Sequence, residues 1–283
     1  MRIKSLSFFV GIILLVSLFT SFLPARAWTV QPQKVNFGNI QGINLIGWLF
    51  KPDGNGPYPA VVMMHGCLGA YSFGEPAQGI NSLYREWGDR LVNAGYVALL
   101  IDSFTPRNAL QNQCRNGTSE VSEVNDRPYD AYAGLNYLSS QAFVDANKIA
   151  LLGWWHGGSS TMATMDVTKF AADSSFKAAV AFYPDCGLSN AFGGIRRNTW
   201  KPYAPFVILH GSADTVANPT TCMTRVLSAQ QLGATNVTIN IFENAQHHFD
   251  GAKQVTDAFT QYGVDAKIAA DAQIMHFFGT HLR

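Results

Sequence analysis

Residues 151–158 read Leu-Leu-Gly-Trp-Trp-His-Gly-Gly, and this is the most informative segment of the chain. An apolar run ends at Gly153, the single residue Trp155 stands midway between Gly153 and Gly157, and a helix-compatible stretch follows. Glycine has no side chain to collide where a strand turns sharply into a helix, and both flanking positions are glycine. The pattern therefore predicts a tight strand-to-helix turn that lifts the Trp155 side chain above the end of its strand.

The rest of the chain alternates short apolar runs with helix-like stretches. Residues 41–51 have apolar side chains at alternate positions. Apolar runs lie at 60–64, 97–101, 149–152, 178–182, 206–209 and 237–242, and helix-like stretches lie at 81–94, 130–140, 158–167, 219–232 and 255–278. Strands that are apolar on both faces and alternate with helices predict a mostly parallel sheet covered by helices on both faces. We expect seven or eight strands in one domain, with the polar stretch 104–125 as a loop at the strand C-terminal edge, where such sheets place their sites.

Side chains that can carry chemistry follow two of the later strands. Asp214 closes the segment His-Gly-Ser-Ala-Asp after the strand at 206–209, and His247 lies within 244–250 after the last strand. A nucleophile position, then an acid, then a histidine is the chain order of the catalytic triad in α/β-hydrolases. In such a triad the acid orients the histidine, and the histidine takes the proton of the nucleophile.

Backbone N–H groups beside the turn complete the predicted site. Residues 65–69, His-Gly-Cys-Leu-Gly, follow the strand at 60–64. The loop after this strand donates one N–H of the oxyanion hole in α/β-hydrolases, and the residue after the nucleophile position donates the other. We therefore expect the N–H groups of Cys67 and His156 to bind the oxyanion of a tetrahedral intermediate.

Taken together, these segments resemble the dienelactone hydrolase-like members of the α/β-hydrolase superfamily. The segments that carry the resemblance are 65–69, 102–107 (Asp-Ser-Phe-Thr-Pro-Arg), 153–158, Asp214 and 245–249, and they cover nearly the whole chain after residue 27 in the family's order. The resemblance implies an α/β-hydrolase fold and cleavage of small carboxylic esters or lactones through a covalent acyl-enzyme. It also implies that no cofactor or metal is needed and that Asp214 and His247 are two members of the triad.

The nucleophile position departs from the family pattern, which has Ser or Cys there. Trp155 carries only an indole N–H, which donates hydrogen bonds and cannot form an acyl-enzyme. The chain is therefore expected to be inactive or impaired as an esterase, either as an altered form of an active hydrolase or as a natural non-catalytic relative. A third alternative is another nucleophile, but Ser159 lies one helical turn too far along and Cys67 is expected to be disulfide-bonded.

Residues 1–27 have the layout of a secretory signal. A short basic start with Arg2 and Lys4 precedes an apolar run, and the segment ends Pro-Ala-Arg-Ala before Trp28. We expect cleavage after residue 27 and a periplasmic or secreted protein with no membrane contact after cleavage. An uncleaved membrane anchor is the alternative, because the apolar run is nearly long enough to span a bilayer.

The charge balance excludes one broad class of partner. The chain has 20 Lys plus Arg and 19 Asp plus Glu, a formal charge of +1. Removing the three basic residues of segment 1–27 leaves 17 basic and 19 acidic residues, or −2. A near-neutral chain gives no electrostatic reason to expect a nucleic-acid partner. We expect a small ester or lactone as substrate, while the oligomeric state stays open.

The cysteines are interpreted in the light of the expected export. The chain has four, Cys67, Cys114, Cys186 and Cys222, and their wide spacing matches no zinc pattern. In an oxidising compartment an even number of cysteines predicts disulfides, so we expect one or two bridges. Four cysteines allow three pairings, and the sequence does not choose among them.

Most other polar residues near the strand ends are expected to have structural roles. We expect the His65 ring to brace the oxyanion loop, and Asp102 and Arg107 to bond loop backbone. Arg127 and Asp130 lie near the start of one predicted helix, where a local ion pair or a helix cap is expected.

Histidines and tryptophans give a second group of expectations. His247 and His248 are not expected to form a metal site, because adjacent residues of an extended strand face opposite ways; His248 is expected in the pocket wall or at the surface. Trp154 either lines a pocket or packs beneath the turn. Packing roles are expected for Trp48, Trp87 and Trp200.

Two rival functional classes stay in view. A binding protein, with Trp155 capping an emptied pocket, would hold a ligand or a partner without turnover. A cofactor-dependent enzyme is less consistent with the sequence, because no Gly-rich dinucleotide fingerprint follows the first strand.

Overall fold

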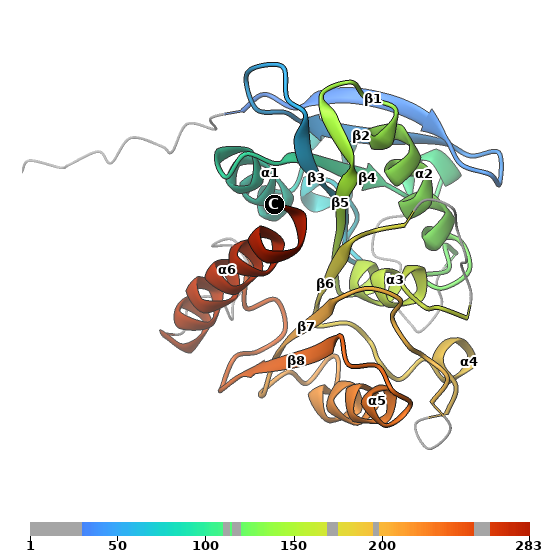
Figure 1. Ribbon diagram of the computed structural model, residues 1–283, viewed down its shortest axis with the longest axis vertical. Helices are drawn as coiled ribbons and strands as arrows, with labels where there is room; N and C mark the ends of the chain where they lie inside the picture. Colours follow the sequence, from blue (N-terminus) through green and yellow to red (C-terminus); the bar gives the residue numbers. More distant parts are fainter. Residues whose placement is uncertain (1–29, 110–113, 115–119, 169–174, 195–197, 252–260) are drawn as a thin grey trace, which may run out of the picture.

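One twisted eight-stranded sheet runs through the molecule (Figure 1). The computed structural model describes residues 30–109, 114, 120–168, 175–194, 198–251 and 261–283. The strands are β1 (Gln33–Gly38), β2 (Asn44–Phe50), β3 (Tyr58–Met64), β4 (Val97–Asp102), β5 (Val144–Trp154), β6 (Ala178–Phe182), β7 (Phe206–Gly211) and β8 (Val237–Phe242).

The order of the strands creates a topological switch point at the centre of the sheet. The order is β1-β2-β4-β3-β5-β6-β7-β8, with β1 and β2 antiparallel to their neighbours and the remaining strands parallel. The chain leaves β3 toward β4 on one side and returns to β5 on the other. Ligands of open α/β sheets bind beyond the carboxyl ends of strands at such a switch point. The loops after β3 and β5 are therefore in the position of a site.

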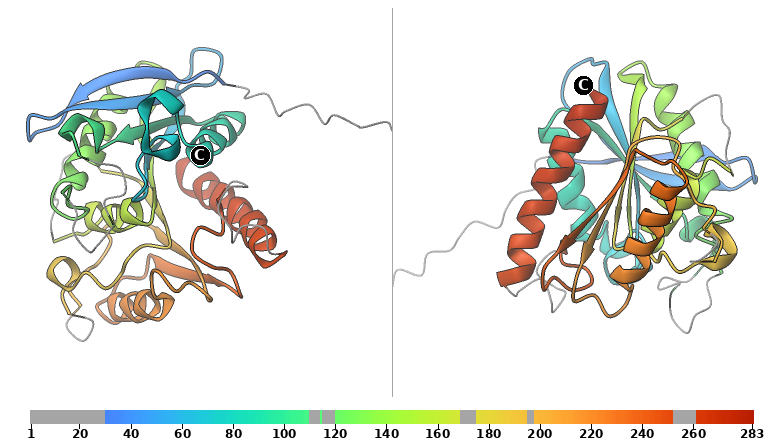
Figure 2. Two further views of the ribbon diagram at one scale, coloured as in Figure 1. Left: turned by 180° about the vertical axis from the view of Figure 1, so that it is seen from behind. Right: turned by 60° about the horizontal axis from the view of Figure 1, so that its bottom comes forward.

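Helices cover both faces of the sheet, as Figures 1 and 2 show. The α-helices are α1 (Ser82–Asn93), α2 (Arg127–Ser139), α3 (His156–Thr164), α4 (Ser189–Phe192), α5 (Pro219–Gln231) and α6 (Gln261–Leu282), and the short 3₁₀ helices are η1 (Ser72–Gly74), η2 (Pro76–Gln78) and η3 (Thr105–Arg107). Apolar residues of α2, α3 and α5 pack on one face, and those of α1 and α6 pack on the other. Successive side chains of a strand face opposite ways. Val62 of β3 therefore packs in the core with α2, α3 and α5, and Val61 packs in the core with α1 and α6.

Most predicted elements are present, with four main differences. The edge strand β1 was not predicted, and β5 begins at Val144 rather than 149. The short helix α4 was also not predicted. The helix predicted at 255–278 is described from Gln261 and continues to Leu282, while 252–260 lies outside the described residues.

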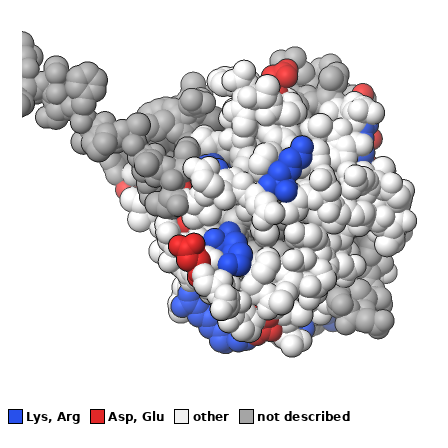
Figure 3. Space-filling view, turned by 90° about the horizontal axis from the view of Figure 1, so that it is seen from above, with Lys and Arg blue, Asp and Glu red and all other residues white. Residues whose placement is uncertain are grey.

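The predicted packing tryptophans lie in or against the cores. Trp87 and Trp200 are fully buried, and Trp48 is half-buried against the core that contains α1. On the face drawn in Figure 3, charged side chains of both signs are scattered among uncharged ones.

The expected signal segment, 1–27, lies outside the described residues. Among the residues that are described, no helix is long and apolar enough to cross a bilayer.

Both cysteine pairs are bridged, which answers the pairing that the sequence left open. Cys67 is bonded to Cys114, and Cys186 is bonded to Cys222. The first bridge ties the loop after β3 to the segment that follows η3. The second ties the loop after β6 to α5.

Candidate active site

The turn between β5 and α3 has the backbone of a nucleophile elbow. Trp155, the residue between them, has φ 48° and ψ −111°, in a region that side-chain-bearing residues rarely adopt. Its N–H donates to the Phe182 carbonyl at 3.0 Å, and its carbonyl accepts from the Ser159 N–H at 2.8 Å. A non-glycine residue held in such a conformation costs on the order of 1–3 kcal/mol. The surrounding strands and helix impose this cost on Trp155.

Close packing explains the glycines of the turn. A Cβ on Gly153 would lie 2.1 Å from the Gly157 carbonyl oxygen, and one on Gly157 would lie 2.1 Å from the Met64 carbonyl oxygen. Gly158, which the sequence analysis did not single out, is similarly close: its Cβ would lie 2.8 Å from the Phe182 oxygen. The glycines let α3 start directly against the ends of β3 and β6.

Asp214 and His247, predicted as acid and base, lie together. The distance from His247 Nδ1 to Asp214 Oδ2 is 2.7 Å, and both side chains are buried. Burial alone would raise the pKa of the Asp214 carboxyl. Hydrogen bonds from His247 and from the N–H groups of Val216 and Ala217 outweigh burial, so the pKa is lowered. The ionised carboxylate accepts the Nδ1 proton, which leaves the His247 Nε2 lone pair free to act as a base.

The Trp155 indole lies against this histidine. The ring centroids of Trp155 and His247 are 4.7 Å apart with planes at 82°, an edge-to-face contact. His247 Nε2 is buried and has no hydrogen-bond partner among the described residues. The structure therefore places an indole against the imidazole ring of His247, where a triad would have a hydroxyl or thiol.

The orientation of His248 differs from the one predicted from the sequence. Its ring lies 4.4 Å from that of His247 and 5.4 Å from that of Trp155, so the two histidines do not face opposite ways. The reason is local: His248 has φ 61°, and the segment is a turn rather than an extended strand. His248 is half-buried and forms a wall beside Trp155, as predicted. No group of three potential metal ligands occurs among the described residues.

The two predicted oxyanion donors flank the elbow. His156 is the first residue of α3, and Cys67 follows Gly66 in the loop after β3. A Cβ on Gly66 would lie 3.7 Å from the Trp155 Cβ and 3.3 Å from the Trp154 carbonyl oxygen. The loop that carries the Cys67 N–H is therefore packed directly on the turn that carries the His156 N–H.

The His65 ring braces this loop, as predicted. Its Nε2 accepts from the Ser103 N–H at 3.2 Å, so the ring proton is on Nδ1, which donates to the Gly66 carbonyl at 2.8 Å. The Gly66 N–H donates to the Tyr84 hydroxyl at 2.8 Å. Burial, and then the Arg127 charge, hold the pKa of His65 well below its usual value.

The prediction of a local ion pair between Arg127 and Asp130 is wrong. Arg127 Nη1 lies 2.8 Å from His156 Nδ1, and its Nε donates to Ser103 Oγ at 3.3 Å. Asp130 instead receives two hydrogen bonds from Arg107, at 2.8 and 2.9 Å. Arg127 is fully buried, and burial lowers its pKa to about 10, so the guanidinium is charged at neutral pH.

Asp102 has the structural role predicted for it. Its Oδ1 accepts from the N–H groups of Phe104 and Thr105, at 3.0 and 3.1 Å, and so caps the turn after β4. Arg107 bonds the Ser103 carbonyl at 2.8 Å as well as Asp130. Both residues therefore shape the loop after β4.

Glu123 was not found by sequence reasoning. Its Oε2 lies 3.5 Å from His156 Nε2. Burial and the neighbouring Asp185 carboxylate raise its pKa to about 8, although the Arg127 charge opposes the shift. No motif marks this residue, because it reaches the site from a loop.

A buried carboxylate beneath the site was also missed. Asp250 accepts from the Trp154 indole N–H at 2.7 Å and from the Tyr183 hydroxyl at 2.6 Å. The Tyr183 oxygen in turn accepts from His248 Nδ1 at 3.3 Å. Trp154 is fully buried, so it packs beneath the turn. Burial raises the pKa of Asp250.

The alternative nucleophiles are both committed to other bonds. Ser159 Oγ bonds the carbonyls of Trp155 and Asp185, at 3.4 and 3.3 Å, and accepts from the Asp185 N–H at 3.0 Å. Cys67 is in a disulfide. Neither side chain presents a free hydroxyl or thiol to His247.

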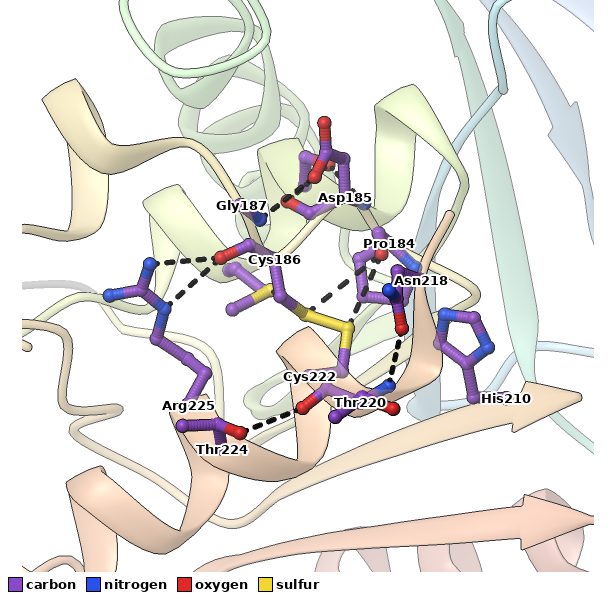
Figure 4. The surroundings of a disulfide bond; sticks show 12 residues. Pro184, Asp185, Cys186, Gly187, His210, Asn218, Thr220, Cys222, Thr224 and Arg225 are labelled. Carbon is purple, nitrogen blue, oxygen red and sulfur yellow. Dashed lines mark hydrogen bonds between the residues drawn. A yellow bond between two sulfur atoms is a disulfide. The ribbon is translucent and has the colours of Figure 1, made fainter. Parts of the chain in front are cut away.

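The Cys186–Cys222 disulfide secures the loop beside the site (Figure 4). Arg225 of α5 donates to the Cys186 carbonyl through Nε and Nη2, at 3.2 and 2.9 Å. Its Nη1 bonds the Phe192 and Gly193 carbonyls and Asn198 Oδ1. This loop starts at Pro184, directly after Tyr183, so the disulfide and Arg225 hold the loop that follows β6.

Comparison with known proteins identifies the family. The sequence model of the dienelactone hydrolase family matches residues 45–282, which include the elbow, Asp214 and His247. The chain belongs to the dienelactone hydrolase family. It is therefore a member of a family of esterase-type hydrolases.

Relatives and solved structures agree with this family assignment. A Bradyrhizobium protein named a probable 2-oxo-3-(5-oxofuran-2-ylidene)propanoate lactonase is 28% identical over 159 residues, which cover 55% of this chain and 57% of that protein. A protein from Klebsiella pneumoniae, named for the dienelactone hydrolases, superposes with a TM-score of 0.65 at 19% identity and covers 88% of this chain and 98% of its own. Thermogutta terrifontis esterase 2, phosphorylated by paraoxon, superposes with a TM-score of 0.61 at 20% identity. The match covers 87% of this chain and 94% of the esterase chain. These likenesses confirm the α/β-hydrolase fold.

Proposed function

We propose that this dienelactone hydrolase family member is a hydrolase scaffold for small carboxylic esters or lactones whose reaction is blocked at the nucleophile position. The observation that carries the proposal is the Asp214–His247 pair. It is hydrogen-bonded at 2.7 Å and buried, the His247 Nε2 has no partner among the described residues, and the His247 ring meets the Trp155 ring with centroids 4.7 Å apart. An oriented imidazole without a nucleophile has no proton to take, because the indole of Trp155 is not acidic enough to supply one.

In a chain with serine at position 155, each group has one task. The serine oxygen attacks the ester carbonyl, and its proton goes to His247 Nε2. Asp214 stabilises the imidazolium that forms, while the N–H groups of Cys67 and His156 bind the carbonyl oxygen as it becomes negative. The imidazolium then protonates the leaving alcohol, and water hydrolyses the acyl-enzyme by the same route. With Trp155 the first of these bonds cannot form.

The substrate class is supported by the relatives. One is named a lactonase, and the structures of Thermogutta terrifontis esterase 2 include complexes with propionate and butyrate. Short acyl groups are therefore the first choice for this chain.

The test compares three chains that differ only at position 155. We expect Trp155→Ser to hydrolyse p-nitrophenyl acetate, and the unmodified chain and Trp155→Ala to stay near background. The alanine variant is the matched control, because it removes the indole to the same extent and differs from serine by one hydroxyl. Loss of a triad member leaves only about 10³–10⁴-fold acceleration over water, so the serine variant should exceed both by orders of magnitude.

Two results would overturn the proposal. Equal turnover by the serine and alanine variants would show that residue 155 is not the nucleophile position. Tight, saturable quenching of indole fluorescence by butyrate in the unmodified chain, with no turnover by Trp155→Ser, would favour a binding protein. The contact between Trp155 and the two histidines is the observation that makes this second function testable.

A further inference from the structure

One buried guanidinium, that of Arg127, contacts the side chain of His156, whose backbone N–H is one of the two predicted oxyanion donors. Arg127 is fully buried at the start of α2 and stacks over the Phe104 ring, with its guanidinium carbon 5.4 Å from the centroid. Its hydrogen bonds go to Ser103 and His156, and its Nη2 has no partner among the described residues. A charge in this position is costly to bury. A residue with only a packing role could be apolar, so the charge needs another explanation.

The contact with His156 fixes one side of the hole. A guanidinium can only donate, so His156 Nδ1 is the acceptor at 2.8 Å, and the ring is neutral with its proton on Nε2. The His156 ring is therefore held at the first residue of α3, the residue whose backbone N–H is the predicted donor.

The contact with Ser103 reaches the other side through a short relay. Arg127 Nε donates to Ser103 Oγ, and the Ser103 N–H donates to His65 Nε2. His65 Nδ1 then donates to the Gly66 carbonyl. That carbonyl and the Cys67 N–H belong to one planar peptide and point in opposite directions. Anchoring the carbonyl therefore sets the direction of the Cys67 N–H.

We propose that Arg127 is the positioning residue of the oxyanion hole, since one guanidinium orients the His156 side directly and the Cys67 side through Ser103 and His65. The inference rests on the proposed function, in which these two N–H groups bind the developing oxyanion. Lysine cannot substitute for arginine here, because a single ammonium group lacks the planar, forked donors that reach two acceptors at fixed angles.

The kinetic test uses the Trp155→Ser chain as the parent. We expect Arg127→Gln to lower kcat about 10- to 100-fold with KM changed less than about threefold, since the oxyanion forms only in the transition state. Arg127→Lys should recover little of the loss.

Arg225→Gln is the matched control. Arg225 is equally buried and also bonds several loop oxygens, but it contacts neither His156 nor Ser103. Its replacement should lower Tm and leave kcat within about threefold. Equal kcat values for the Arg127→Gln and Arg225→Gln chains would overturn the proposal.

A second test needs no catalysis and uses the unmodified chain. Nitrogen-15 NMR of labelled histidines reports which ring nitrogen carries the proton. We expect the Nδ1–H form for His65 and the Nε2–H form for His156, and both sets of signals should shift in Arg127→Gln but not in Arg225→Gln. Unchanged signals in Arg127→Gln would overturn the inference. If that variant does not fold, Arg127→Lys answers the same question. An inactive Trp155→Ser chain would contradict the proposed function, while the NMR result would still decide the role of Arg127.

Discussion

The indole of Trp155 meets the imidazole of His247 edge to face, with ring centroids 4.7 Å apart. The histidine keeps its bond to Asp214 on the other side, at 2.7 Å. The acid–base pair is thus fully assembled beside a residue that it cannot activate. Because the histidine and its acid are in place while residue 155 is not a nucleophile, each part of the site can be tested separately.

Asp214 is expected to control the state of His247. In the Trp155→Ser background, Asp214→Asn should lower kcat by roughly 10⁴. The amide NH2 donates to Nδ1 where the carboxylate accepted from it, so the imidazole adopts the wrong tautomer. Steady-state kinetics with p-nitrophenyl acetate measures the loss.

Asp102→Asn is the control for this substitution. Asp102 also stands at a strand end and also caps two loop N–H groups through Oδ1, as Asp214 does. Unlike Asp214, it does not contact His247. Similar losses of kcat in the two variants would show that strand-end capping, rather than orientation of the histidine, explains the effect.

Glu123 should make the protein less stable as the pH rises. Its pKa is about 8 in the folded protein and near 4.5 in the unfolded chain, so the folded state holds a proton between these values that the unfolded state has lost. Its contribution to the free energy of unfolding is greatest below about pH 4.5 and is lost as the pH rises toward 8. Glu123→Gln should therefore stabilise the protein by on the order of 2 kcal/mol near pH 8.5 and little near pH 5.

Urea unfolding at the two pH values measures this difference. The exposed Glu243→Gln should leave the free energy of unfolding unchanged at both. A Glu123→Gln effect of the same size at both pH values would contradict the assignment, because it would not depend on ionisation.

Gly157 is expected to tolerate no side chain. A Cβ there would lie 2.1 Å from the Met64 carbonyl, a backbone atom of the central strand β3 that cannot move aside. Gly157→Ala should lower the free energy of unfolding by about 3 kcal/mol or more.

Gly279→Ala, in α6, is the matched control. A Cβ at that position meets nothing within 4 Å, and alanine should raise stability by about 0.5–1 kcal/mol. Thermal unfolding followed by circular dichroism compares the two, and equal shifts would argue against the packing of the elbow described above.

The Cys186–Cys222 disulfide is expected to contribute to stability rather than to chemistry. It closes a loop of 36 residues, for which the chain-entropy model gives about 3–4 kcal/mol. Replacing both cysteines with alanine should lower the free energy of unfolding by that amount and leave kcat of the Trp155→Ser chain within about threefold. A large fall in kcat at unchanged stability would show that the bridge positions residues of the site.

Sequence patterns predicted the parts of the fold that depend on local rules. Apolar runs located six of the eight strands, since buried strands need side chains that are apolar on both faces, and alternating apolar residues located β2. The exception is β1, an edge strand whose residues are mostly exposed and which therefore has no such run. The glycines at 153 and 157 predicted the elbow because close backbone approach demands them.

Contacts between distant segments were not predictable in the same way. Arg127 and Asp130 are neighbours on a helix, which favours a local pair, but Arg127 reaches His156 and Asp130 is taken by Arg107. Asp250 has no sequence signal either, because its partners Trp154 and Tyr183 come from other strands. Such pairings follow from how loops fold back over the sheet edge.

The presence of tryptophan at the elbow position, residue 155, has a consequence at the level of the gene. Tryptophan is encoded by TGG alone, and serine by TCG among other codons, so one base separates this residue from a nucleophile. Everything else that the proposed reaction needs is built by segments spread from the loop after β3 to the turn after β8. A change at that base would leave all of those segments untouched. Under the proposed function, an inactive and an active form of this protein would therefore differ by a single base.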